Sequence, residues 1–306
     1  MFRKILLFYT RYFAVWVVIF GVVAYFWPGP FRALKPFNRL FFALTMFGIG
    51  AVLQIEDFKR ILQQPVIVLI GCCTQFITMP LGAFVLAKAL HLPAEIAVGL
   101  ILTGAAPGAM ASNVISYIAK ADTAYSVSLT TVSTLLCPVL TPGITLLLAG
   151  SRVPVPFWGM MQDVIYMVIV PLFLGFGLRH YLKKKLEKVL PIFPAISVTF
   201  IIFICSLVIA LNRDYLPMVT RMLLAGVVIL NLYGMLAGYL VAVVFRMNKS
   251  RRRTLSIEIG MQNAGLGTTL ALLHLGEKAA MPAALFVFVC IITASAAAQV
   301  WQKRPA

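Results

Sequence analysis

The sequence predicts an all-α polytopic membrane protein with ten transmembrane helices in two inverted five-helix repeats. Three observations lead to this prediction. The 306-residue chain is 61% hydrophobic and only 11% charged, and a water-soluble domain of this length cannot bury so much apolar surface. Ten stretches are apolar over about 20 residues, which suffices to span a bilayer as a helix. Two of these stretches are interrupted by glycine and polar residues at corresponding places.

The ten apolar stretches divide evenly between two halves of a single membrane transport unit, 1–306. Each half, about 1–152 and 153–306, contains five spans. Because five is an odd number, the second half enters the membrane from the opposite side, as an inverted repeat requires. In chain order the predicted spans are 12–30, 38–54, 65–90, 95–118, 124–149, 156–178, 189–211, 217–245, 254–275 and 279–301.

The net charge of +17 is explained by orientation in a bilayer and not by nucleic-acid binding. With the N-terminus inside, 18 of the 26 Lys and Arg residues fall at cytoplasmic span ends and 8 fall on the other side. This is the positive-inside bias of membrane proteins. Both termini are therefore predicted to be cytoplasmic, with basic side chains contacting lipid headgroups. The sequence predicts no nucleic-acid partner and no obligate protein partner.

The fourth span of each half is interrupted. The first reads "LTGAAPGAMASN" (102–113), where Pro107 removes a backbone donor, and the second reads "SIEIGMQNAGLG" (256–267). Glycine packing and a proline kink explain either segment taken alone. Together, the corresponding interruptions indicate the binding site of a transporter, because non-helical backbone within a membrane must be buried in protein or line a water-filled cavity.

Of the nine acidic residues, Glu258 is interpreted as the one within a predicted span, since Glu95 opens its span and Asp163 is assigned to a span end. A charge at that depth is costly, so the carboxylate needs a partner; the alternatives are snorkelling to the interface or pairing with Arg251 to Arg253. Gln262 follows Glu258 by four residues and Thr130 follows Ser126 by four, which places each pair on one helical face. Oxygen ligands without thiolate or imidazole favour Na⁺ over a transition metal.

The break after Pro107 also predicts an anion site. The amides of Met110 to Ser112 would begin a half-helix and face a cavity, and the break near Asn263 would do the same from the second half. Unpaired N–H groups and the helix dipole attract anions at such ends. An organic carboxylate is therefore the predicted substrate.

The segments "PGAMASNVISYIAKADTAYSVSLTTVSTL" (107–135) and "LSIEIGMQNAGLGTTLAL" (255–272) resemble bacterial members of the bile acid:sodium symporter family. The resemblance implies a cell inner-membrane location, a panel of helices 1, 2, 6 and 7, and a core of helices 3, 4, 5, 8, 9 and 10 with helices 4 and 9 broken and crossing. It implies two Na⁺ ions. One would bind Ser112, Asn113, Ser126, Thr130 and Glu258; the other would bind Gln75, Glu258, Gln262 and the carbonyls of Ile259 and Met261.

The substrate is less well defined by the resemblance. Several bile-acid-transporting relatives have a His-Asn pair in span ten, where this chain has Cys290-Ile291, and another in span eight, where it has Asn231-Leu232. The residue before the Ala-Ser-Asn run is Met110 instead of a small one. Substrate contacts are expected at Met110, Ala111, Asn263 and Cys290, with a bile acid-like or a smaller pantoate-like acid as the substrate.

The sequence therefore predicts a Na⁺-coupled symporter of an organic anion that works by alternating access, and not an enzyme. A proton-coupled carrier that uses Glu258 is the nearest alternative. An intramembrane enzyme is a remote one, because no nucleophile–base pair or metal motif is present at membrane depth.

Overall fold

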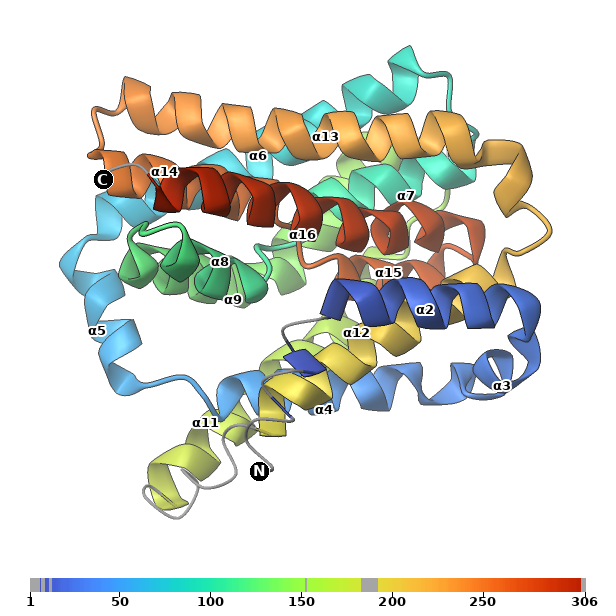
Figure 1. Cartoon of the computed structure of the whole chain (residues 1–306), viewed down its shortest axis with the longest axis horizontal. Coiled ribbons are helices and arrows are strands. Elements are labelled where there is room, and N and C mark those ends of the chain that lie inside the picture. Colours follow the sequence, from blue (N-terminus) through green and yellow to red (C-terminus); the bar gives the residue numbers. More distant parts are fainter. Residues whose placement is uncertain (1–5, 7–8, 11–12, 152, 183–191, 304–306) are drawn as a thin grey trace. The chain divides into compact units, whose positions relative to one another are not determined.

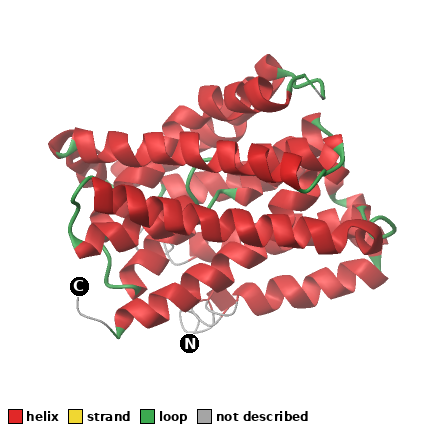
Figure 2. Ribbon diagram, turned by 90° about the horizontal axis from the view of Figure 1, so that it is seen from above, coloured by secondary structure: helices red, strands yellow, loops and turns green. Residues whose placement is uncertain are grey.

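The computed structural model describes residues 6, 9–10, 13–151, 153–182 and 192–303. Within these ranges the chain is helical and contains no strand, as Figure 2 shows. Helices occupy each of the ten apolar stretches, although residues 12 and 189–191 of the predicted spans lie outside the described residues. The protein is therefore an all-α protein, as predicted.

Five described helices are long and apolar enough to cross a membrane, or six if Lys35–Gly50 and Ile55–Gln63 are counted as one span. The five are Pro65–Ala89, Thr123–Ala149, Phe157–Leu182, Arg221–Val244 and Lys278–Gln302. Other apolar helices in the described part are shorter, because breaks and turns divide the apolar sequence. The chain is thus a polytopic membrane protein, while the ten-span inverted repeat stays a prediction.

The chain forms two compact units, each made from two separate parts of the sequence. The first unit comprises Met1–Gln54 and Met161–Met218, and the second comprises Ile55–Met160 and Val219–Ala306. One helix, α10 (Phe157–Val164), contains the boundary at Met160.

Helices of the first unit pack through small residues and aromatic rings. A Cβ atom added to Gly50 would collide with the backbone of Leu172, so two helices approach closely there. The rings of Phe42 and Phe200 meet edge to face, with centroids 5.3 Å apart. The elements are α2 (Phe13–Phe26), α3 (Pro28–Ala33), the 3₁₀-helix η1 (Lys35–Phe37), α4 (Asn38–Gly50), the π-helix η2 (Ile165–Ile169), α11 (Val170–Leu182) and α12 (Ile192–Leu211).

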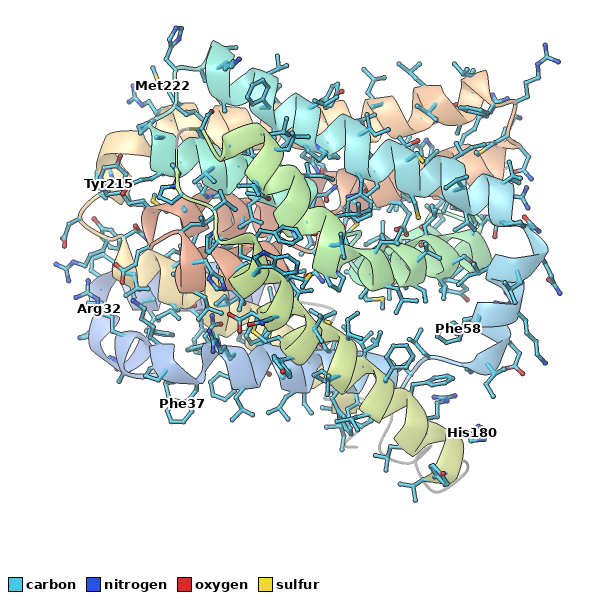
Figure 3. All side chains as sticks on the ribbon, turned by 180° about the vertical axis from the view of Figure 1, so that it is seen from behind. Arg32, Phe37, Phe58, His180, Tyr215 and Met222 are labelled. Atoms are coloured by element: carbon cyan, nitrogen blue, oxygen red, sulfur yellow. The ribbon has the colours of Figure 1, made fainter. Side chains whose placement is uncertain are left out.

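The C-terminal end of α12 is tied to α3. The guanidinium of Arg32 donates two hydrogen bonds to the Ala210 carbonyl, at 3.0 and 2.7 Å. Arg32 and Tyr215 lie at this end of the unit, and His180 lies at the other (Figure 3). A cation at the C-terminal end of a helix satisfies a free carbonyl and complements the helix dipole.

The second unit contains both interrupted spans. Figure 1 shows α8 alongside α9, and α15 alongside α16. The elements are α5 (Ile55–Gln63), α6 (Pro65–Ala89), α7 (Ala94–Ala105), α8 (Ala111–Ile118), α9 (Thr123–Ala149), α13 (Leu216–Val244, beginning just before the boundary), α14 (Lys249–Gly260), α15 (Ala264–His274), the 3₁₀-helix η4 (Lys278–Ala280) and α16 (Met281–Gln302).

Both predicted interruptions are confirmed. The span predicted at 95–118 consists of α7 and α8, and the span predicted at 254–275 consists of α14 and α15. Side-chain caps start α9 and α15, whereas α8 begins after Met110 without one. Asp122 accepts a hydrogen bond from the Tyr125 amide at the start of α9, at 3.0 Å, and Asn263 accepts one from the Leu266 amide at the start of α15, at 3.2 Å. Asn and Asp are favoured caps because their oxygens satisfy free amides.

Candidate functional site

The two helix breaks pair with each other. Gly108 and Gln262 form an isolated antiparallel bridge. The Ala109 amide donates to the Met261 carbonyl at 2.8 Å, and the Asn263 amide donates to the Pro107 carbonyl at 2.7 Å. Backbone groups released by each break are therefore satisfied by the other, as burial requires.

This pairing brings four helix ends together. The C-terminal ends of α7 and α14 carry partial negative charge from their last carbonyls, and the N-terminal ends of α8 and α15 carry partial positive charge from their first amides. One place in the fold therefore offers ligands for a cation and donors for an anion. Broken helices that meet in this way form ion and substrate sites in membrane transporters.

Glu258 lies at this crossing and is only 2% exposed. Its Oε1 accepts hydrogen bonds from the hydroxyl of Ser112, at 2.5 Å, and from the hydroxyl of Ser126. Neither snorkelling nor an arginine partner is observed, because the side chain is buried and Arg251 pairs instead with Asp122, at 3.1 Å. Among the described residues Glu258 takes part in no ion pair.

The residues predicted for the first ion come together around this carboxylate. Asn113 Oδ1 accepts from the Ser126 hydroxyl at 2.8 Å and from the Thr130 hydroxyl at 3.4 Å. Ser112, Asn113, Ser126, Thr130 and Glu258 thus form one hydrogen-bonded cluster contributed by α8, α9 and α14. Its hydroxyl, amide and carboxylate oxygens are hard ligands. In the described part of the chain, no group of three or more His, Cys, Asp or Glu could hold a metal ion.

The residues predicted for the second ion lie around the breaks. The Gln75 amide donates to Gln262 Oε1 at 2.5 Å and to the Ala106 carbonyl at 3.0 Å. The Gln262 amide donates to the Ile259 carbonyl at 2.9 Å. The helical-face argument for Gln262 was wrong, because α14 ends at Gly260 and Gln262 lies in the extended break. Its side-chain amide nonetheless hydrogen-bonds to the carbonyl of Ile259, the residue after Glu258.

A small cavity adjoins Glu258. Its volume is about 10 Å³, and it is lined by Gly71, Cys72, Gln75, Gly108, Leu129, Ser133, Glu258 and Ile259. A cavity of roughly 10–15 Å³ holds one water molecule, so this one has room for a single small ion. Gly108 keeps the space open, since a Cβ at that position would lie 3.0 Å from Glu258 Oε2.

The four residues predicted to contact substrate are not joined into one site by hydrogen bonds. Met110 and Ala111 are partly exposed or exposed at the start of α8, and Asn263 caps α15. Cys290 is buried in α16, where its thiol donates to the Val287 carbonyl at 3.4 Å. Of the amides predicted to be free after the first break, that of Ser112 is not, because it donates to the Ala109 carbonyl at 3.0 Å.

Four further polar residues at the crossing were not predicted as site residues, although Asn231 was noted as a departure from the relatives' His-Asn pair. The hydroxyl of Ser133 accepts from the Gly108 amide at 3.3 Å, and that of Thr141 donates to the Ala105 carbonyl at 2.8 Å. Ser133 follows Ser126 by seven residues, so the helical period could have identified it. Asn231 and Thr293, which hydrogen-bond at 2.7 Å, lie in the apolar helices α13 and α16, where no such spacing singles them out.

Comparison with known proteins decides the family. A sequence model of the sodium bile acid symporter family matches residues 39–218. The chain belongs to this family. It is 38% identical over 302 residues to the uncharacterized sodium-dependent transporter YocS of Bacillus subtilis, covering 99% of this chain and 94% of the relative. It is 33% identical over 293 residues to the probable sodium/metabolite cotransporter BASS1, chloroplastic, of Arabidopsis thaliana, covering 95% and 73%.

Family membership makes this protein a membrane transport protein and not an enzyme. The oxygen-lined crossing of α7–α8 and α14–α15 is accordingly a candidate site for transported ions and solute. The cluster around Glu258 comes from the two segments on which the family resemblance was based, 107–135 and 255–272, and Gln75 of α6 joins it from outside them.

Proposed function

We propose that this family member couples the entry of Na⁺ to the uptake of a small organic anion by alternating access. The burial of Glu258 is the observation that supports this most directly. Its carboxylate is 2% exposed, receives two hydroxyl hydrogen bonds and has no ion pair in the described part of the chain. An uncompensated charge in a low-dielectric interior is costly. A bound cation supplies the missing charge, and the related Bacillus protein is named as sodium-dependent.

Two Na⁺ ions share this carboxylate in our proposal. The first binds Ser112, Asn113, Ser126, Thr130 and Glu258, whose oxygens already form one cluster. The second binds beside Glu258 at the cavity that Gln75 and Ile259 line, with Gln262 and the Met261 carbonyl as further ligands. Carbonyl oxygens have two lone pairs, so the Met261 carbonyl can bind an ion while it accepts from the Ala109 amide.

The substrate in this proposal is an organic carboxylate held at the half-helix N-termini, by the first residues of α8 and by Asn263. Met110 and Ala111 leave that end of α8 accessible, and Cys290 contributes to selectivity. The relatives named sodium/metabolite cotransporters favour a metabolite-sized acid, such as a pantoate-like carboxylate, over a bulky bile acid.

Alternating access requires one part of the protein to move relative to another. We propose that the first compact unit is the panel and the second is the core that carries the ions. The protein lies in a bacterial cytoplasmic membrane, with both termini in the cytoplasm. The charge bias of the loops supports this orientation.

Purified protein and then reconstituted vesicles test the proposal. Organic acids are screened for thermal stabilisation that depends on sodium, and each acid that passes is measured for uptake into vesicles under a sodium gradient. Uptake must require sodium and saturate with the acid. Uptake that follows a proton gradient and ignores sodium would assign Glu258 to proton transport instead.

A further inference from the structure

A buried amide of α13 holds the carbonyl end of α14. Asn231 is 0% exposed, and its Nδ2 donates to the Gly260 carbonyl at 2.8 Å. Its Oδ1 accepts from the hydroxyl of Thr293 on α16, at 2.7 Å. The amide orientation is fixed by chemistry, since a backbone carbonyl can only accept and the nitrogen must face it.

Three consecutive carbonyls at this end of α14 have three different donors. Ile259 accepts from the Gln262 side chain, Gly260 accepts from Asn231, and Met261 accepts from the Ala109 amide. Of these three residues, only Ile259 lines the cavity beside Glu258; Gly260 and Met261 do not. The donor from α13 therefore engages the one carbonyl of the three that is not proposed as an ion ligand.

The packing of α13 against α14 leaves little freedom at this point. A Cβ atom added to Gly234, one turn after Asn231, would lie 2.9 Å from the Ile259 carbonyl oxygen. A Cβ atom added to Gly260 would collide with the Met235 side chain. The two helices thus touch through backbone here, and Asn231 is the polar member of that contact.

We propose that Asn231 and Thr293 act as a positioning pair for the second Na⁺ site. By fixing the direction of the Gly260 carbonyl, the pair sets the direction of the carbonyls of Ile259 and Met261 on either side. Thr293 contributes by holding Asn231 in the orientation that donates to Gly260. This inference rests on the proposed sodium coupling and adds two residues that do not touch an ion.

The test measures the midpoint and the Hill slope of sodium-dependent thermal stabilisation in purified full-length protein, with potassium keeping the ionic strength constant. Asn231→Leu removes both hydrogen bonds at similar volume, and Thr293→Val removes only the hydroxyl. We expect the sodium concentration at half-maximal stabilisation, the sodium midpoint, to rise about tenfold or more. A loss of affinity of this size is typical when groups that orient metal ligands are removed. The Hill slope should fall toward one, because the first site is left intact.

Two control variants separate positioning from general stability. Thr293→Ser keeps the hydroxyl and should restore the midpoint and the slope of the wild type. Thr145→Val removes a buried hydroxyl that bonds only within α9, to the Thr141 carbonyl at 2.7 Å, and should leave both values unchanged.

Two results would overturn the inference. The first is a loss of melting temperature in Asn231→Leu and Thr293→Val that is equal in sodium and in potassium, with an unchanged midpoint, which would make the pair merely structural. The second is a Thr293→Ser variant that behaves like Thr293→Val. If the wild type itself shows no sodium-dependent stabilisation, the proposed function fails, and this outcome is distinguishable because it precedes any variant.

Discussion

Ser112 and Glu258 are hydrogen-bonded at 2.5 Å although 146 residues of sequence separate them. The serine stands in the first turn after one helix break, and the glutamate stands in the last turn before the other. The contact therefore links the two interrupted spans through Glu258, the one buried carboxylate among the residues that the structure describes. Its burial and its hydroxyl partners make it the position from which sodium coupling is best tested.

Replacing Glu258 with glutamine should abolish sodium-dependent stabilisation. Glutamine keeps the shape but removes the negative charge, so bound cations lose their counter-charge. In potassium the Glu258→Gln protein should melt at the same temperature as the wild type or higher, because an uncompensated buried charge has been removed. Melting curves over a sodium titration measure both effects.

The matched control is Glu95→Gln, because Glu95 is exposed and pairs with Lys278 at 3.1 Å. A surface pair of this kind contributes at most about 1 kcal/mol to stability. The sodium-dependent stabilisation of the Glu95→Gln variant should therefore equal that of the wild type. A Glu258→Gln protein with an unaltered sodium midpoint would show that coupling resides elsewhere.

Gly108→Ala should remove the second ion and spare the first. The new methyl group would enter the cavity of about 10 Å³ and lie 3.0 Å from Glu258 Oε2. We expect the Hill slope for sodium to fall from above one to about one. Gly143→Ala is the control, since its Cβ would meet only Phe157 Cε2 at 3.6 Å, an ordinary contact. An unchanged slope in Gly108→Ala would refute two-ion binding at this cavity.

The breaks could be predicted from the sequence because they depend on local chemistry. Pro107 removes a backbone donor at the first break, and Gly260 is the last residue of α14 at the second. The cluster around Glu258 was also predicted, through the family resemblance and the period of α9, which brings Ser126 and Thr130 to one side. Position along a helix and residue type were sufficient for the breaks and for the Ser126–Thr130 pair, whereas the full set of ligands came from the resemblance.

Features that depend on contacts between distant segments could not be predicted from local pattern. The expected helical alignment of Glu258 and Gln262 was wrong because the helix ends between them. The two breaks pair through their backbones, and Ser112 at the start of α8 hydrogen-bonds to Glu258. Both contacts depend on tertiary packing. Asn231 reaches Gly260 across 29 residues and Thr293 reaches Asn231 across 62, and neither spacing carries a period.

Asn263→Asp should weaken binding of the substrate without weakening binding of sodium. Aspartate caps a helix as well as asparagine does, so the hydrogen bond from the Leu266 amide and the stability should be retained. The added negative charge lies where the anion is proposed to bind, and it should weaken binding of the organic acid by about tenfold or more. The sodium midpoint in the absence of the acid should not rise.

Asn263→Ala is the complementary variant. It loses the cap at a cost of about 1 kcal/mol, so its melting temperature should fall. Because it adds no charge, its substrate affinity should fall less than that of Asn263→Asp. Isothermal titration with the acid identified by screening measures the affinities. Equal affinity of the wild type and Asn263→Asp would place the anion away from this helix end.

The orientation can be tested by fusing a reporter after Ala306. Because 18 basic residues fall at the predicted cytoplasmic ends and 8 on the other side, we expect a cytoplasmic reporter such as a fluorescent protein to be active there. A periplasmic phosphatase at the same position should be inactive. Activity of the phosphatase alone would contradict both the orientation and an even number of spans.

Uptake should be driven by the membrane potential as well as by sodium. Glu258 contributes one negative charge, two Na⁺ ions contribute two positive charges and a monoanionic substrate contributes one negative charge, so the loaded site is neutral. A neutral site crosses a low-dielectric barrier more readily than a charged one. If Glu258 stays with the protein, each cycle carries one net positive charge inward, and an inside-negative potential of about 100 mV favours uptake by about 2.3 kcal/mol per cycle.

Vesicles with an imposed potassium diffusion potential should therefore accumulate more substrate as the interior becomes more negative, with a Hill slope for sodium above one. Uptake that is independent of potential and has a slope of one would rule out two Na⁺ ions per monoanion and indicate a single-ion mechanism at Glu258.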